Sequence, residues 1–250
     1  MDYILGIPTE IPRGWTKQFQ YLGDLFRRVQ HLQGDFVECG LGEGNTLAMM
    51  AYYIGGEDRK PSRTLWGFDS FKGWPPPTPW DASPRNPEEG DWTVSREMVT
   101  KRLEESWLNN NEEFPKLDVR IVEGFLRDTL PDFLKKYKGH GFAFVHLDLD
   151  LYPGYHDALE HLWPLIVSGG TVAFDEFQEF HPELPGGYVV DGHPVAKWPG
   201  CDKAVTEYFQ SRRAQLCGPS PYKDDEKGFL CNQEGFWYDE PTGKYFVIKR

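Results

Sequence analysis

The sequence is poor in cysteine and has no long apolar run, and each shortage excludes a class of protein. Its 250 residues include 4 cysteines, none in a Cys-x-x-Cys pair, so we expect neither a disulfide framework nor a zinc site. No apolar stretch approaches the ~20 residues of a membrane span, and the first residues lack a basic region followed by an apolar core. These absences predict a cytoplasmic protein with reduced thiols and no membrane partner.

Basic residues are outnumbered as well. The chain has 27 lysines and arginines against 39 aspartates and glutamates, which gives a formal net charge of -12. A surface with this balance repels the backbone of DNA or RNA, so we expect no nucleic-acid partner. Internal repeats and linker-like stretches are also absent, and the length suffices to bury a core. We therefore expect a single domain over residues 1–250.

The sequence does contain apolar stretches that end in acids. Asp148 and Asp150 follow the stretch FVHL, and Asp175 and Glu176 follow the stretch TVAF. A helical pattern with the length of one βαβ crossover separates them, so both should be parallel strands that end side by side at the carboxyl edge of a sheet. Single acids of this kind are typical of helix caps or a solvated loop edge. Four together repel one another unless a cation holds them, and carboxylates suit magnesium.

A glycine-rich turn joins an expected strand over residues 35–39 to an expected helix over residues 45–53. Its glycines let the backbone pass close to a ligand, although an ordinary tight turn uses glycines too. Glu38 would repel a pyrophosphate, but it can accept a hydrogen bond from an ammonium group such as that of S-adenosylmethionine. The residues that we assign to cofactor binding here are Glu38, Gly40, Gly42, Gly44, Asn45 and Thr46.

Two further strand ends indicate an adenosine ligand. The second expected strand ends in Asp69 and Ser70, where a Rossmann-like fold holds the ribose hydroxyls. The third is followed by Gly124 and Phe125, where an adenine ring could lie. These two strands are expected over residues 64–68 and 117–122.

Apolar residues recur at spacings of three or four between the strands, which predicts helices that pack on the sheet. Asp128 or Thr129 should cap the helix after the third strand, with Pro131 in its first turn. Residues 168–170, which include two glycines, should end a later helix. Residues 1–33 are expected to form a helical extension before the first strand. The expected helices cover residues 15–32, 45–53, 94–108, 154–167 and 202–209.

Two long loops should leave the same carboxyl edge. The first, over residues 72–92, is rich in proline and carries Trp74, Trp80 and Trp92, so we interpret it as a lid over a binding site, with a passive surface insertion as the alternative. The second loop covers residues 177–200. Strands are expected around residues 228–230, 236–238 and 245–248, the last two paired as a hairpin.

Five motifs, in this order, resemble the macrocin O-methyltransferase family of class I methyltransferases, which use S-adenosylmethionine. The resemblance extends from about Gly34 to the carboxyl terminus. It implies an α/β, Rossmann-like fold with a mostly parallel seven-stranded sheet, a C-terminal antiparallel hairpin and helices on both faces. The motifs are residues 38–44 (ECGLGEG), 66–71 (WGFDSF), 124–131 (GFLRDTLP), 146–152 (HLDLDLY) and 174–177 (FDEF).

The resemblance also implies a site and a substrate class. It places magnesium ligands at Asp148, Asp175 and Glu176, the last standing where the family often has an aspartate, while Asp150 holds the cofactor or the loop. Family members methylate sugar hydroxyls of macrolides and other glycosylated natural products. A small-molecule saccharide or glycosylated acceptor is therefore implied. Because family members commonly assemble, a homo-oligomer is implied as well.

The chemistry of such a reaction requires a proton acceptor. A hydroxyl is a poor nucleophile until its proton leaves, so the enzyme must activate the oxygen and align it with the sulfonium. We predict that Asp148 takes the proton beside the magnesium ion. His146 lies on the same strand face but deeper and is interpreted as a core histidine, whereas His181 and His193 are loop residues.

Three functions are compatible with the sequence. The first is a magnesium-dependent O-methyltransferase that acts on a saccharide or glycosylated acceptor. The second performs the same chemistry on a phenol or catechol, which the tryptophan-rich loop would also accommodate. The third is a non-catalytic Rossmann-like module that binds an adenosine ligand and acts through partners.

Overall fold

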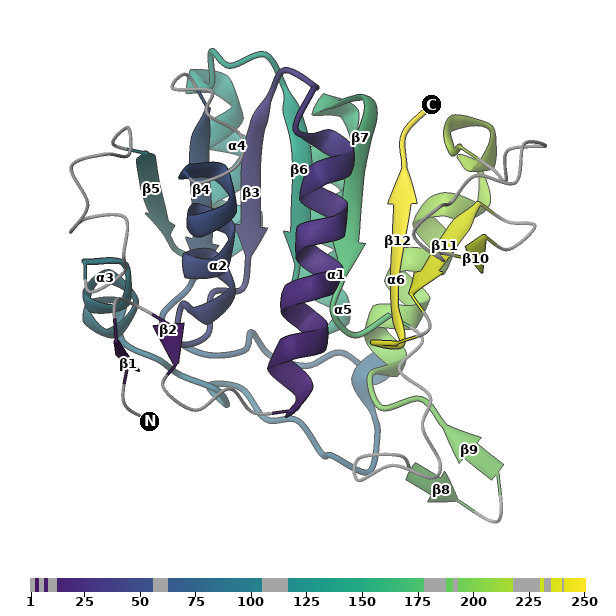
Figure 1. Ribbon diagram of the computed structural model, residues 1–250. Helices are drawn as coiled ribbons and strands as arrows, with labels where there is room; N and C mark the ends of the chain where they lie inside the picture. Colours follow the sequence, from purple (N-terminus) through teal and green to yellow (C-terminus); the bar gives the residue numbers. More distant parts are fainter. Residues whose placement is uncertain are drawn as a thin grey trace.

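One sheet with helices on both faces forms the centre of the molecule (Figure 1). The computed structural model describes residues 3–4, 7–8, 13–55, 63–104, 117–177, 188–190, 193–217, 230–231, 235–239 and 241–250. Within them, the strands of the main sheet follow the order β10-β11-β12-β7-β6-β3-β4-β5. The expected seven-stranded, mostly parallel sheet is confirmed, and the two-residue strand β10 adds an eighth strand at its edge.

The five strands from β7 to the edge strand β5 are parallel, and β12 pairs antiparallel with both β7 and β11. The hairpin of β11 and β12 is the one that the sequence predicts. Parallel pairing brings the carboxyl ends of β3, β4, β6 and β7 to one edge, where the acids follow. The strands are β3 Asp35–Cys39, β4 Thr64–Asp69, β5 Asp118–Glu123, β6 Phe142–Leu147, β7 Ile166–Phe174, β10 Leu230–Cys231, β11 Phe236–Asp239 and β12 Lys244–Ile248.

Within the described part of the chain, six α-helices connect or cover these strands. Helices α1 and α2 pack on one face of the sheet, and α4, α5 and α6 pack on the other (Figure 1). No described helix is long and apolar enough to cross a membrane. The helices are α1 Arg13–Val29, α2 Asn45–Tyr53, α3 Arg96–Glu104, α4 Leu126–Lys136, α5 Tyr152–Leu162 and α6 Pro199–Gln210. Two small hairpins join β1 Tyr3–Ile4 to β2 Ile7–Pro8 and β8 Tyr188–Val190 to β9 His193–Val195.

Helix α1 packs on the sheet as expected, through aromatic contacts. Phe26 stacks on Phe36 of β3 with 5.4 Å between the ring centroids, and it meets Phe144 of β6 edge-on at 4.8 Å. All three side chains are buried. Removing a buried phenylalanine side chain costs about 3–5 kcal/mol, so Phe26 is a major contact of α1 with this face. The packing of α1 on β3 and β6 holds in place the two strands that lead into the glycine turn and into Asp148 and Asp150.

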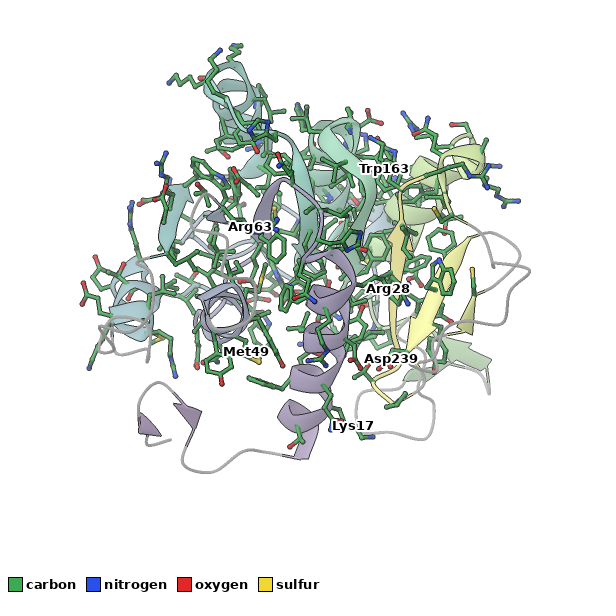
Figure 2. The ribbon with its side chains drawn as sticks, turned by 45° about the horizontal axis from the view of Figure 1, so that its top comes forward. Lys17, Arg28, Met49, Arg63, Trp163 and Asp239 are labelled. Atoms are coloured by element: carbon green, nitrogen blue, oxygen red, sulfur yellow. The ribbon has the colours of Figure 1, made fainter. Side chains whose placement is uncertain are left out.

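The segment around Trp163 differs from the expected helix over residues 154–167. Helix α5 ends at Leu162, a 3-10 turn over Trp163–Leu165 follows, and β7 begins at Ile166. Pro164 lies in that turn, where it cannot continue the hydrogen bonding of the helix. The buried Trp163 side chain then fixes the turn, because its Nε1 donates to Gln215 at 2.8 Å (Figure 2).

Residues 168–170 were expected to end a helix but lie inside strand β7. Gly169 has φ 81°, and its N–H donates to the carbonyl of Lys249. The pairing of β6 with β7 is irregular at the same place. The two glycines therefore mark a strand irregularity, which is their other common role.

The start of α4 also differs from the sequence-based expectation. The N-cap is Phe125 rather than Asp128 or Thr129, and Pro131 lies inside the helix. The cause is the preceding Gly124, whose φ of 133° and hydrogen bond to the carbonyl of Asp69 allow the helix to begin at once. Helix α3 begins at Arg96, where Ser95 Oγ accepts from the Met98 N–H, and the expected residues beyond Glu104 lie outside the described part.

Candidate active site

A cavity of about 370 Å³ lies at the carboxyl edge of the parallel strands. It contains acids from the ends of β4, β6 and β7, together with residues of the loop 72–92 and the residues before α6. Glu38, Gly44, Asn45 and Thr46 do not line it. The predicted site residues that do line it are Gly40, Gly42, Asp69, Ser70, Gly124, Phe125, Asp148, Asp150, Asp175 and Glu176.

The glycine turn packs directly on the strand end that carries Asp148. Gly40 has φ 84°, and a Cβ atom at this position would lie 1.7 Å from the carbonyl oxygen of Asp148. Gly42 has φ 48°, but a Cβ there would meet nothing within 4 Å. Gly40 is thus required by close packing, whereas Gly42 borders open space in which a ligand can lie.

Asp69 holds two turns together at the cavity wall. Its Oδ2 accepts a hydrogen bond from the Leu41 N–H of the glycine turn, and its Oδ1 accepts from the Phe71 N–H, both at 2.7 Å. Ser70 is buried, and its hydroxyl donates to the carbonyl of Gly73 at 2.9 Å. Asp69 therefore shapes this wall of the cavity, and Ser70 fixes the start of the loop.

Three carboxylates gather in the cavity. One oxygen from each of Asp148, Asp150 and Glu176 lies within 4.8 Å of the others. Burial and the charge of Asp175 raise the pKa of Asp148 to about 6, and burial with the charges of Asp148 and Asp175 raises the pKa of Asp150 to about 8. Burial and the charges of Asp148, Asp150 and Asp175 raise the pKa of Glu176 well above its usual range. Such crowding of oxygen donors fits a hard divalent cation, which would relieve the repulsion.

Each of two acids in this cluster is oriented by an aromatic donor. The Trp74 Nε1 donates to Asp150 Oδ2 at 3.0 Å, and the Tyr155 hydroxyl donates to Glu176 Oε2. The backbone N–H of Asp150 also donates to Glu176 Oε2, and Asp150 has a left-handed φ of 57°. The local backbone of Asp150 and the indole of Trp74 thus turn this carboxylate toward the cluster.

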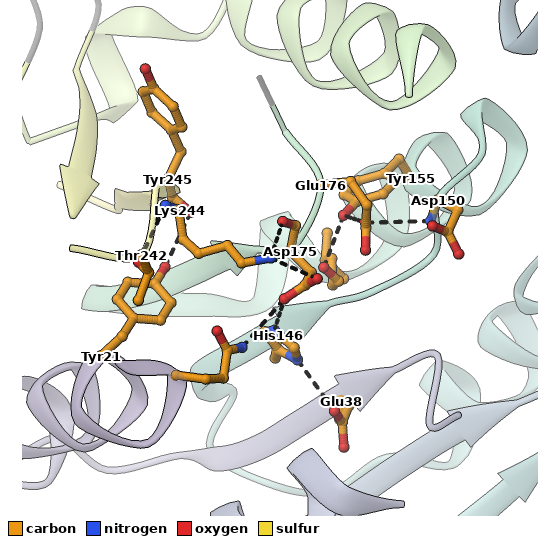
Figure 3. Close-up of polar contacts among 12 residues, drawn as sticks. Tyr21, Glu38, His146, Asp150, Tyr155, Asp175, Glu176, Thr242, Lys244 and Tyr245 are labelled. Atoms are coloured by element: carbon orange, nitrogen blue, oxygen red, sulfur yellow. Dashed lines mark hydrogen bonds and ion pairs between the residues drawn. The ribbon is translucent and has the colours of Figure 1, made fainter. Parts of the chain in front are cut away.

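Asp175 has a different environment (Figure 3). Lys244 Nζ lies 2.8 Å from Asp175 Oδ2 and donates to the Asp175 carbonyl at 2.7 Å. Gln18 Nε2 donates to Oδ1 at 3.3 Å, and His146 Nε2 lies 3.8 Å from the same oxygen. Burial raises the pKa of Asp175, but Lys244 and His146 outweigh burial and hold this pKa below its usual range. Asp175 therefore already has a protein cation beside it.

His146 and Glu38 form a buried pair behind the cavity. His146 Nδ1 lies 3.2 Å from Glu38 Oε1, and both side chains are 1% exposed. Burial lowers the pKa of His146, but Asp175 and Glu38 outweigh it and raise this pKa to about 10. The interpretation of His146 as a core histidine agrees with this placement. His181 lies outside the described residues, and His193 lies in β9.

Two buried acceptors lie near the glycine turn, on residues that do not themselves line the cavity. Glu38 Oε2 and Asn45 Oδ1 have no hydrogen-bond partner in the described part of the chain. Buried acceptors without partners are costly, and the ammonium group of S-adenosylmethionine is a donor that would satisfy them. The residues around the turn therefore fit this cofactor.

The loop over residues 72–92 is fixed at both of its ends and in its middle. Its ends meet where the Trp74 N–H donates to the Asp91 carbonyl at 2.9 Å. In its middle, the buried Asp81 accepts from the Tyr152 N–H at 2.7 Å, and a Cβ on Gly200 would lie 1.7 Å from Asp81 Oδ1. The loop is thus bound to the starts of α5 and α6.

Sequence reasoning missed several residues at the site. Lys244 begins the last strand, β12, and carries no local motif that would connect it with Asp175. Arg85, Lys197 and Trp198 line the cavity as well. The stretch WPG that includes Trp198 was a signal for them, because a proline at the first helical position fixes the residue before it at the helix start.

A family model described as macrocin-O-methyltransferase (TylF) matches residues 16–184. Demethyldecarbamoylnovobiocin O-methyltransferase of Streptomyces niveus is 29% identical over 165 residues, which is 61% of this chain and 56% of that protein. A tetracenomycin rhamnosyl 4'-O-methyltransferase of Streptomyces olivaceus is 32% identical over 155 residues, which is 58% of this chain and 53% of that protein. The chain thus spans about half the length of these relatives.

Solved structures share the fold. The calicheamicin methyltransferase CalS11 superposes with a TM-score of 0.67 at 21% identity, over 95% of this chain and 80% of that protein. The mycinamycin-pathway methyltransferase MycE, solved with Mg, S-adenosylhomocysteine (SAH) and mycinamycin VI, superposes with a TM-score of 0.51 at 14% identity, over 97% of this chain and 51% of that protein. At these identities the likeness shows a class I methyltransferase fold.

Proposed function

Because the chain belongs to the macrocin O-methyltransferase family, we propose that it transfers a methyl group from S-adenosylmethionine to a hydroxyl of a sugar or glycosylated natural product, with the help of Mg²⁺. The observation that carries this proposal is the cluster of Asp148, Asp150 and Glu176 beside a glycine turn at the same strand edge. The relatives named above are O-methyltransferases of glycosylated natural products, which supports the substrate class.

The cofactor would be held by the ends of the first three parallel strands. Gly42 leaves space at the turn, and Asp69 lies where ribose hydroxyls can be bound. Gly124 and Phe125 form the wall on which an adenine ring can lie. Glu38 and Asn45 offer buried acceptors for the ammonium group. Bound S-adenosylmethionine supplies an electrophilic methyl group on a sulfonium.

Asp148 and Glu176 are the cation ligands on which the sequence and the geometry agree. The sequence-based set adds Asp175, whereas the geometry brings Asp150 into the cluster and gives Asp175 a partner in Lys244. A bound Mg²⁺ would lower the pKa of the acceptor hydroxyl and orient it. We assign the third position to Asp150, because its carboxylate has no lysine to neutralise it among the described residues.

Asp148 would accept the proton of the acceptor hydroxyl. It lines the cavity between the glycine turn and the other acids, so an acceptor placed near the methyl group lies within its reach. In this reaction the acceptor oxygen would form the new C–O bond as the S–CH₃ bond of S-adenosylmethionine breaks, SAH would be left, and Asp148 would take the hydroxyl proton. Trp74 and Trp198, both buried, exclude water from this end of the cavity.

A phenolic acceptor is a second candidate, favoured by the tryptophans of the loop. Trp92 lines the cavity, is 67% exposed and has a left-handed φ of 60°. An exposed indole held at the mouth of a cavity can stack on a flat ring as well as on a sugar. A parallel acceptor panel of glycosides and phenols, followed by release of SAH, separates the two substrate classes.

The first test of the proposal is a calorimetric titration with SAH, in the presence and absence of Mg²⁺. We expect SAH to bind, and we expect at least one acceptor of the panel to be methylated faster with Mg²⁺. Asp148→Asn should lose this turnover and retain SAH binding. Asp132→Asn, which removes an exposed acid of α4, is the matched control and should change neither property. A chain that binds SAH but methylates no acceptor would support the non-catalytic alternative.

A further inference from the structure

Two of the three cationic side chains that line the acid-rich cavity lie over one indole ring, that of Trp198. The guanidinium carbon of Arg85 lies 4.5 Å from the ring centroid of Trp198, and Lys197 Nζ lies 5.7 Å from the same ring. All three residues line the cavity. Positive charge is therefore gathered over one indole in a site whose other charged groups are mostly carboxylates.

Arg85 shares a cavity with several acids and forms no ion pair with any described residue. Its guanidinium stacks on Trp198, which is 4% exposed and meets the Trp74 ring edge-on at 5.4 Å. Stacking on a buried, fixed indole holds the guanidinium in the cavity wall, where its charge lowers the pKa of Asp150. Because no described carboxylate lies within ion-pair distance of Arg85, its N–H donors remain for a ligand.

The place of Arg85 in the chain separates it from the residues assigned to the cofactor. Those residues follow β3, β4 and β5, whereas Arg85 belongs to the loop 72–92, and Lys197 directly precedes the N-cap of α6. Trp74 connects this wall to the acid cluster, because it contacts Trp198 and donates to Asp150. A sugar with one hydroxyl at the acid cluster would therefore extend toward Arg85.

We propose that Arg85 and Lys197 form a subsite for an anionic group on the acceptor, a phosphate or a carboxylate carried by the sugar. A guanidinium can bind either group through two parallel hydrogen bonds, and a nearby ammonium adds charge. Without such cations, the carboxylates of the cavity would repel an anionic acceptor. The proposal rests on the proposed function and narrows its acceptor to acidic sugars.

The test is calorimetric binding of three sugars to the full chain with SAH and Mg²⁺ present. Glucose 1-phosphate carries a phosphate, glucuronate carries a carboxylate, and methyl glucoside is neutral. We expect one of the two anionic sugars to bind more tightly than methyl glucoside. Arg85→Ala should weaken that binding by about tenfold to a hundredfold, the usual effect of losing a charged hydrogen bond. Arg96→Ala, which removes an exposed arginine paired with Glu123, should leave it unchanged.

The outcomes separate this proposal from the proposed function. If SAH binds but neither anionic sugar binds better than methyl glucoside, or if Arg85→Ala binds them equally well, the subsite is refuted and the methyltransferase assignment stands. If Arg85→Ala instead weakens SAH binding and spares the sugars, the guanidinium serves the carboxylate of the cofactor, and the subsite is again refuted. Loss of SAH binding in the unaltered chain would refute the proposed function. The preference for phosphate or carboxylate identifies the anion.

Discussion

Two groups of carboxylates lie at the same edge of the sheet and differ in their cations. Asp148, Asp150 and Glu176 crowd together, and their pKa values are raised. Asp175, adjacent to Glu176 in sequence, lies against Lys244 and His146, and its pKa is lowered. Carboxylates at the same edge of the sheet thus have pKa values shifted in opposite directions.

The comparison shows that the pKa of an acid at a strand end depends on the side chains that face it from other helices and strands. Lys244 reaches Asp175 from β12, and Gln18 reaches it from α1. Cations act on the acids of the cavity from farther away: His146 and Lys244 lower the pKa of Asp148, and Arg85 lowers the pKa of Asp150, yet both pKa values remain raised. An uncompensated cluster is costly to keep in a folded protein, so the cluster is the part of this edge that a function must explain.

The largest expected effect is on turnover and concerns the cluster of Asp148, Asp150 and Glu176. Asp148→Asn removes the proposed proton acceptor, so kcat should fall by about 10²–10⁴-fold, the range typical of losing a general base. SAH binding, measured by calorimetry, should be retained. A variant with unchanged kcat on an accepted substrate would remove Asp148 from the chemistry.

For Asp175, we expect removal of its cationic partner to lower the stability of the fold. Lys244→Met leaves Asp175 without its closest cation, and this should lower the free energy of unfolding by about 1–3 kcal/mol. Urea denaturation followed by tryptophan fluorescence measures this change. Lys203→Met breaks the more exposed pair of Lys203 with Glu207 and should cost under about 1 kcal/mol. Equal losses of unfolding free energy in the two variants would contradict the claim that Asp175 depends on Lys244 more than an exposed acid depends on its partner.

The two groups should also differ in their response to Mg²⁺. At a hundredfold excess over its Kd, a bound cation stabilises the fold by about 2.7 kcal/mol, which thermal unfolding detects as a higher Tm. We expect Asp150→Asn to abolish most of this gain and Asp175→Asn to retain it. The opposite pattern would mean that Lys244 releases Asp175 to the cation, as the family resemblance implies.

The sequence was sufficient to predict the parts of the fold that depend on local pattern. The glycine turn, the parallel strands with acids at their ends and the C-terminal hairpin are all present. Residues 166–170 were misassigned to a helix and its end, because Ile166 and Val167 continue an apolar helical spacing while Pro164 ends the helix earlier. The pairing of β7 with β6, which no local pattern indicates, places these residues in a strand.

The sequence could predict that four acids meet at one edge of the sheet, but not that Asp175 would have a lysine partner while the other three would form a cluster. Which acid is compensated depends on Lys244, which lies 69 residues from Asp175 in sequence and reaches it only through the β12–β7 pairing. The contact of Arg85 with Trp198 likewise joins two separate loops. Long-range pairing of this kind leaves no periodic signal in either segment, so one sequence without its fold cannot reveal it.

The most direct test of the cation cluster is a calorimetric titration of the metal-free protein with Mg²⁺. We expect one Mg²⁺ per chain in the unaltered protein and no measurable binding in Glu176→Gln, because Glu176 belongs to both proposed ligand sets. Glu97→Gln, on the first turn of α3, is the control and should bind Mg²⁺ normally. Absence of Mg²⁺ binding by the unaltered protein, or normal binding by Glu176→Gln, would contradict the assignment of this cluster as a metal site.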